Sequence, residues 1–199
     1  MNYIIRTTPT GKTVLINLIP KNGCTTLANM VAQIDNLQLP AHELAETSTY
    51  WHTHIDIHSQ IAQPNEIDAD IKIAIKRDPV QRFISFWKNR ILHHNDFDFD
   101  HDSDIDDFIE HYHTDFHHLP TVQEHILPQT YYAGKLSNYT HIYTMKDFEK
   151  IASLLTDEFQ KPIVNLHLQR STNIDFELTR KQTKWVKNHF AEDYLNGWC

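Results

Sequence analysis

The segment from residue 14 to residue 32 constrains this chain most, because it reads as a strand, a short loop and a helix in direct succession. Residues 14–19 are almost all apolar, as in a buried strand, and residues 26–32 have a composition that favours a helix. The loop at residues 20–26, which overlaps the helix by one residue, holds one lysine, one glycine and two threonines. Such a loop presents backbone N–H groups at a helix N-terminus, where anions bind. The segment therefore predicts either an anion-binding loop or an ordinary turn with threonine as the N-cap.

A glycine–lysine–threonine run at residues 11–13 resembles the end of a Walker A nucleotide-binding motif. That motif has a glycine five positions before its final glycine, where this chain has Arg6, and it opens a helix. Here the run lies between two expected strands, at residues 2–6 and 13–18. We therefore interpret it as a hairpin turn.

A second loop follows the apolar segment 71–76, which we expect to be a strand. The loop begins with Arg77 and leads into a helix expected over residues 80–92, with Pro79 at the first helical position. Arginine makes forked contacts to phosphate, and Ser85 lies two turns into this helix. Taken alone, the loop also fits a local salt bridge and a helix start. Paired with the first loop at the carboxyl ends of parallel strands, it predicts a ligand with two separated anionic groups.

Further strands are expected at residues 50–58 and 139–143, and further helices at 24–37, 104–112, 147–159 and 176–194. Alternating strands and helices predict a three-layer α/β domain with a mostly parallel central sheet. The length of 199 residues indicates a single domain over 1–199, with an Asp/His-rich insertion around 93–118. Seven aspartates fall within residues 95–107, but the glycine and glutamate of a calcium-binding loop are missing. We interpret this stretch as a solvated loop.

The composition limits the classes of partner. The formal net charge of −8 argues against a surface that coats nucleic acid. We expect no membrane span, because no run of 18 apolar residues and no charged-then-apolar leader occurs. The two cysteines favour a reducing compartment, so we expect a cytoplasmic location.

Histidine is common, with 15 residues. This number fits three alternatives, which are acid–base chemistry, metal binding and a polar surface. The group His111, His113, His117 and His118 lacks the order of a zinc protease motif, and we read it as surface histidines. His54 would share one face of the expected strand 50–58 with His52.

Together the two loops resemble those of the 3′-phosphoadenylyl-sulfate (PAPS) sulfotransferases, especially the carbohydrate sulfotransferase branch, sulfotransferase family 2. Residues 20–26 (PKNGCTT) look like the family's P-loop-like 5′-phosphosulfate-binding loop. Residues 77–88 (RDPVQRFISFWK) look like its 3′-phosphate element, in which an arginine and a serine hold the phosphate. The run from His125 to Gln129 resembles a later signature of the branch. Gln169 departs from the family's usual Asn-x-Ser, and we expect the chain to lack the branch's usual membrane anchor.

The resemblance implies transfer of a sulfuryl group from PAPS to a hydroxyl of a small-molecule or glycan acceptor, without a metal. It implies a general base, for which we favour His125 and keep His54 as the alternative. It also implies that Lys21 stabilises the leaving phosphate. The implied donor-binding residues are Lys21, Asn22, Gly23, Cys24, Thr25, Thr26, Arg77 and Ser85. Two other readings are a P-loop kinase, which needs a magnesium site and a full Walker A motif, and a non-enzymatic metal-binding protein on the same scaffold.

Overall fold

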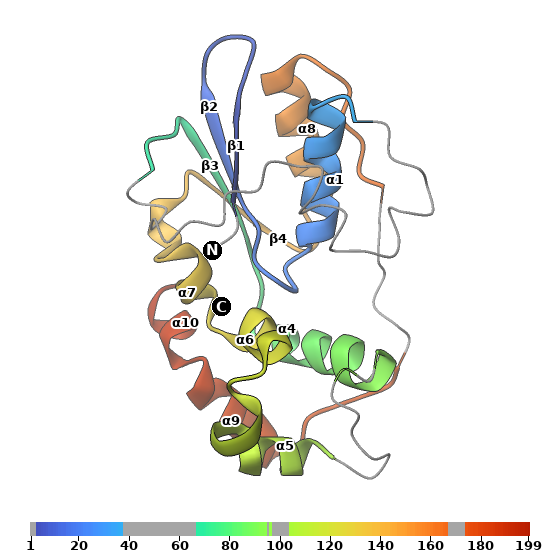
Figure 1. Cartoon of the computed structure of the whole chain (residues 1–199). Coiled ribbons are helices and arrows are strands. Elements are labelled where there is room, and N and C mark those ends of the chain that lie inside the picture. The colour runs from blue at the N-terminus through green and yellow to red at the C-terminus, as the bar shows by residue number, and fades with distance from the viewer. Residues whose placement is uncertain (1–2, 38–66, 95, 97–103, 167–173) are drawn as a thin grey trace.

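The computed structural model describes residues 3–37, 67–94, 96, 104–166 and 174–199 (Figure 1). Within these residues four strands form one sheet in the order β1-β2-β3-β4. β1 pairs antiparallel with β2, whereas β2 with β3 and β3 with β4 are parallel. This mostly parallel sheet confirms the predicted α/β class. The strands are β1 (Tyr3–Thr7), β2 (Thr13–Asn17), β3 (Ile71–Lys76) and β4 (His141–Thr144).

The connection between β1 and β2 is the hairpin predicted for residues 11–13. The Thr8 N–H donates to the Lys12 carbonyl at 2.8 Å, and the Gly11 N–H donates to the Thr8 carbonyl at 2.9 Å. Gly11 has a φ of 89°, which a residue with a side chain rarely adopts. The lysine of this run therefore lies in a hairpin rather than in a nucleotide-binding loop.

Helices cover both faces of the sheet, so the three-layer prediction is also confirmed. Helices α1 (Cys24–Ile34) and α8 (Phe148–Phe159) lie together on one face, and α7 (Gln129–Ala133) lies on the other (Figure 1). Side chains alternate along β2. Val14 and Ile16 belong to the core under α1 and α8, while Leu15 belongs to the core on the α7 side. Both faces of the central strand are therefore apolar, as expected for a parallel strand with helices on each side.

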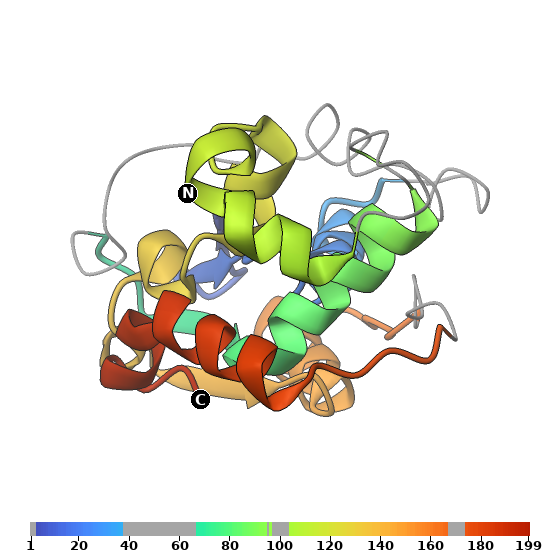
Figure 2. The same cartoon turned by 90° about the horizontal axis from the view of Figure 1, so that it is seen from below.

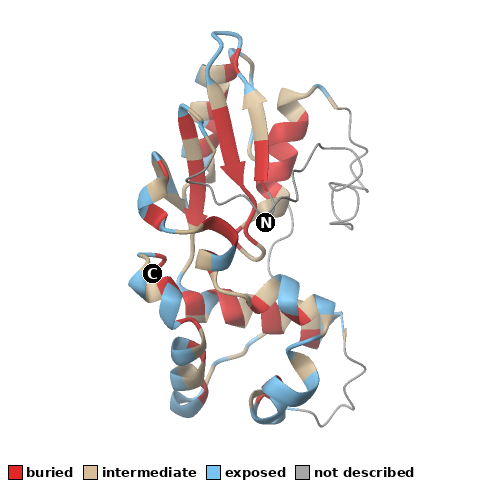
Figure 3. Ribbon diagram, turned by 60° about the vertical axis from the view of Figure 1, so that its left-hand side comes forward, coloured by how far each residue is buried: buried red, intermediate tan, exposed pale blue. Residues whose placement is uncertain are grey.

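A third core lies beyond the carboxyl ends of the parallel strands, among helices stacked below the sheet (Figures 1 and 2). It is rich in aromatic rings, including Phe83, Phe86, Trp87 and Phe108. Figure 3 shows buried residues in red along the helices below the sheet. Ile105 and Phe108 come from the Asp/His-rich segment, so part of that segment contributes to this core. The helices are α4 (Pro79–Phe86), the π-helix η2 (Trp87–His93), α5 (Ile105–His111), the π-helix η3 (Tyr112–Phe116), α6 (Pro120–Ile126) and α9 (Arg180–His189).

Two expected helices differ in detail. The helix expected over 80–92 continues to residue 93, but from Trp87 onward its turns are π-helical. The closing helix is divided at Phe190, which has φ −100° and ψ 27° and lies buried in the aromatic core. A short helix, α10 (Ala191–Leu195), follows, and a 3₁₀ turn, η4 (Leu136–Asn138), packs near it. Among the described residues no helix is long and apolar enough to cross a membrane.

Candidate active site

The loop that follows β2 turns sharply through two residues in the left-handed region. Lys21 has a φ of 67° and Gly23 a φ of 76°. Gly23 is also the N-cap of α1, and a Cβ placed on it would lie 2.2 Å from Cζ of Phe148. Glycine is therefore required at this position both by the backbone conformation and by the close approach of α8.

The N-terminus of α1 has the features of an anion site. Gly23 offers no side-chain cap, and the first turn contains no acidic residue. The N–H groups of a first helical turn lack partners within the helix, and the helix dipole adds partial positive charge there. Because α1 begins at Cys24, three residues after Lys21, the N–H groups of its first turn lie close in sequence to the lysine ammonium group.

The Lys21 ammonium group is partly buried. Its Nζ donates to Oδ1 of Asn89 on η2. Burial, together with the nearby positive charges of Arg90 and Arg77, lowers the pKa of Lys21 to about 8. Desolvated positive charges held close together favour binding of a multiply charged anion, which would relieve their repulsion.

The second loop joins the first through Arg77. Its Nη1 donates to the Lys21 carbonyl at 2.5 Å, and burial next to Arg82 lowers the pKa of Arg77 to about 10. The neighbouring Asp78 carboxylate caps α4 by accepting from the Gln81 N–H at 2.9 Å. Ser85 is half-buried two turns into α4. The structure thus brings the two predicted anion-binding loops into direct contact.

Gln129 is a functional residue whose role the sequence did not reveal. It is fully buried at the start of α7, and its Oε1 accepts from Asn22 Nδ2 at 2.6 Å and from the Arg77 N–H at 3.1 Å. Its Nε2 donates to the Arg77 carbonyl at 2.9 Å. One side-chain amide therefore links both loops. The available sequence signal was a glutamine inside an otherwise apolar run, because a buried amide must find partners.

Asn22 tethers the loop to the sheet. Its N–H donates to the Ile19 carbonyl at 3.1 Å, and its side chain, only 2% exposed, donates to the Ile75 carbonyl at 2.7 Å. Oδ1 of Asn22 is buried without a hydrogen-bond partner. Asn22 therefore shapes the loop, and the N–H groups without a partner inside α1 belong to the residues after Gly23.

His125 lies on α6 near this loop. Its Nδ1 is 2.8 Å from the Thr121 carbonyl, which can only accept, so Nδ1 carries the proton and Nε2 keeps a lone pair. Burial and the positive charge of Lys21 lower the pKa of His125 to about 3. The imidazole is therefore neutral at pH 7 and, in this environment, a weak base with a free lone pair on Nε2.

Several predictions fall elsewhere. His54 and His52 lie outside the described residues, as does Gln169. The residues that the structure describes contain no cluster of three or more histidine, cysteine or acidic side chains able to hold a metal. The aspartates at 98 and 100 are outside that part, while Asp104 caps α5 by accepting from the Asp106 N–H at 2.7 Å.

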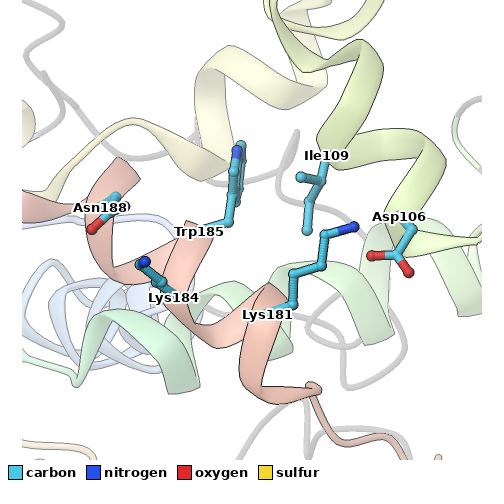
Figure 4. Close-up of a pocket in the computed structure, with 6 residues that line it drawn as sticks. All are labelled: Asp106, Ile109, Lys181, Lys184, Trp185 and Asn188. Carbon is cyan, nitrogen blue, oxygen red and sulfur yellow. The ribbon is translucent and has the colours of Figure 1, made fainter.

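A shallow groove of about 220 Å³ lies between α5 and α9 (Figure 4). The indole of Trp185 and the side chain of Ile109 form its apolar walls, with charged groups around them (Figure 4). The Trp185 ring is 6.0 Å from the ring of Phe83, which places the groove against the aromatic core behind α4. The residues that line the groove are Asp106, Ile109, Lys181, Lys184, Trp185 and Asn188.

Comparison with known proteins gave one match. The model of the Sulfotransferase family matches residues 5–196 of the 199-residue chain. The match spans both loops, Gln129 and His125. No curated protein and no solved structure matched.

Proposed function

The chain belongs to the sulfotransferase family and is a PAPS-dependent sulfotransferase, and from this premise we propose how its residues divide the work of sulfuryl transfer. The observation that carries the proposal is the contact between the two cationic loops at the N-terminus of α1, where Arg77 donates to the Lys21 carbonyl. PAPS carries anionic groups at its 5′ and 3′ positions, so two adjacent loops with partly buried cations match its charge.

The first loop binds the 5′-phosphosulfate. Gly23, Cys24, Thr25 and Thr26 offer the backbone N–H groups of the helix start, and the two threonines add hydroxyl groups. Lys21 lies beside them and stabilises the negative charge that develops on the bridging oxygen as the sulfuryl group leaves. The orphaned Oδ1 of buried Asn22 fits a site completed by a hydrogen-bond donor that arrives with the ligand or its waters.

The second loop binds the 3′-phosphate. Arg77 provides forked donors and Ser85 a hydroxyl, both from the β3–α4 unit. Because Arg77 also holds the Lys21 carbonyl, binding of the 3′-phosphate is mechanically linked to the position of the first loop.

His125 is the proposed general base. Its neutral imidazole, with the Nδ1 proton held by Thr121, directs the Nε2 lone pair to an acceptor hydroxyl. The bound donor would offset the charge of Lys21 that lowers the pKa of His125, so the histidine becomes a stronger base when the donor is present. His54 is retained as the alternative base.

The acceptor is a carbohydrate or glycoconjugate hydroxyl in this proposal. The groove on α5 and α9 supports it, because the indole of Trp185 lies among amide, ammonium and carboxylate groups, a mixture suited to a polar ligand with apolar faces. Replacing Trp185 with alanine should raise the KM for a glycan acceptor and leave the KM for PAPS unchanged. An unchanged acceptor KM would remove the groove from the acceptor site.

Labelled PAPS tests the proposal directly. Transfer to a panel of mono- and oligosaccharides and other hydroxyl compounds is measured by mass shift for the wild type, K21A and the matched control K146A, whose lysine is exposed after β4. We expect K21A to lose about 10²–10³-fold in kcat, the usual cost of removing one donor to a developing charge, and K146A to keep wild-type activity. Equal turnover in K21A and wild type would refute the role of Lys21.

Donor binding is tested without turnover. Adenosine 3′,5′-bisphosphate at about 100 times its Kd should stabilise the protein by about 2.7 kcal/mol, and R77A should abolish most of this shift. ATP with Mg²⁺ serves as the contrasting ligand, since a P-loop kinase would be stabilised by it instead.

A further inference from the structure

The guanidinium group of Arg82 is a fully buried charge near the site, and it is not assigned to either substrate. The residue is 0% exposed on α4, three residues before Ser85. Its guanidinium carbon lies 5.6 Å from the ring centre of Tyr132 and 5.7 Å from that of Phe190. Burial lowers its pKa, and nearby Tyr132 and Asp193 oppose that shift. Burying a cation in this way costs free energy, so a contribution to stability does not by itself explain why Arg82 is buried.

Two backbone carbonyls from distant parts of the chain converge on this group. Arg82 Nε donates to the Pro20 carbonyl at 3.0 Å, and Nη1 donates to the Leu127 carbonyl at 2.7 Å. Pro20 directly precedes Lys21, and Leu127 is the C-cap of α6, two residues after His125. The planar guanidinium holds its donors in a fixed arrangement, so the two carbonyls are held at a fixed separation.

We propose that Arg82 is a positioning residue for sulfuryl transfer, which fixes the distance between the Lys21 loop and the helix end that carries His125. Lys21 faces the leaving oxygen and His125 the attacking hydroxyl, so these two groups must lie on opposite sides of the transferred sulfur. A misplacement of about 1 Å between groups that act in line costs on the order of 10²-fold in rate. The inference rests on the roles given to Lys21 and His125 under the proposed function.

The conservative variant R82K tests the proposal because it keeps the positive charge but replaces the fork with a single ammonium group. A second variant, R82Q, is neutral and retains an N–H donor at about the reach of Arg82 Nε, but not at that of Nη1. The matched control is R180K, in which the arginine is exposed at the start of α9. Each variant is measured for its melting temperature, its Kd for adenosine 3′,5′-bisphosphate, and its kcat and KM with PAPS and an accepted hydroxyl compound.

We expect R82K to lower kcat by about 10–10²-fold while its Kd for the bisphosphate stays within about threefold of wild type. Hydrogen exchange should quicken at the amides of residues 21–24, 127 and 129 in R82K, and R180K should match wild type in every measurement. A wild-type kcat in R82K would overturn the proposal. It would also be overturned if neither R82K nor R82Q binds the bisphosphate, because Arg82 would then serve the fold as a whole.

Failure of the wider functional proposal would look different. In that case K21A and a variant at His125 would turn over like wild type. The effect of R82K on kcat is therefore interpreted only against those two variants, measured in the same assay.

Discussion

Replacing Gln129 with leucine should destabilise the protein and loosen both donor-binding loops at once. In the native structure Gln129 Oε1 accepts from Asn22 Nδ2 and from the Arg77 N–H. Leucine has a similar volume but accepts no hydrogen bond, so Asn22 Nδ2 and the Arg77 N–H both lose Gln129 as their acceptor. Each unsatisfied buried donor costs about 1–3 kcal/mol. Arg77 is only half-buried, so water can reach part of that loss, and we expect a total of about 3–4 kcal/mol.

This cost is a large part of the roughly 5–15 kcal/mol that stabilises a typical domain. For a chain of this length it corresponds to a fall in melting temperature of roughly 6–15 °C. Urea unfolding and differential scanning calorimetry measure it, with Q123L as the control because Gln123 is exposed on α6. Q129L should also bind adenosine 3′,5′-bisphosphate at least about 10-fold more weakly. This corresponds to a coupling free energy of more than about 1 kcal/mol between Gln129 and the donor site.

The variant Q129E separates loss of the acceptor from loss of the donor. A glutamate keeps an oxygen for Asn22 but places a second carboxyl group near Oδ2 of Asp193, which accepts from Gln129 at 3.3 Å in the native protein. Repulsion and burial raise the folded-state pKa of the new carboxyl group above about 4.3, so its destabilising effect is smallest at low pH and grows as pH rises. If Q129L melts within about 2 °C of wild type, the view of Gln129 as the link between the loops is refuted.

Three further outcomes follow from the site. G23A should destabilise the protein, because its Cβ would meet the Phe148 ring and its φ of 76° is strained; the added change F148L should recover only the steric part, as measured by melting temperature. The pKa of His125, followed by NMR, should rise from about 3 when adenosine 3′,5′-bisphosphate binds, because the ligand offsets the charge of Lys21. An unchanged pKa would refute the electrostatic coupling between Lys21 and His125. Because Lys21 must be protonated to stabilise the leaving group and its pKa in the free protein is about 8, kcat/KM for PAPS should fall as pH rises through 8. K21R should remove that fall, and a fall that persists in K21R would assign it to another group.

The parts of the fold set by local pattern were predictable from the sequence. The run 71–76 and the helix starting at Pro79 appear as expected, because alternation with turn signals and a proline at the first helical position are local features. The break of the closing helix at Phe190 was not predictable in this way. It follows from the burial of that ring in the aromatic core, which is a tertiary effect.

The same division applies to the site. Lys21 and Arg77 could be singled out because the loops that hold them have recognisable residue types at fixed offsets from strands and helices. The bonds made by Gln129 and Arg82 join residues 45 to 107 positions apart, so no local pattern reveals them. The role of Asn22 as a tether was missed for the same reason, since its partners Ile75 and Gln129 are 53 and 107 residues away.

These long separations have a consequence for the order of folding. The loop at residues 20–26 emerges early during synthesis, yet Gln129, which hydrogen-bonds to Asn22 in the loop, and Asp193, which hydrogen-bonds to Gln129, emerge much later. Contacts between residues so far apart in sequence form slowly, because the intervening chain must be closed first. A nascent chain that already has β1, β2 and α1 would therefore remain unable to bind the donor until α10 has docked on α7.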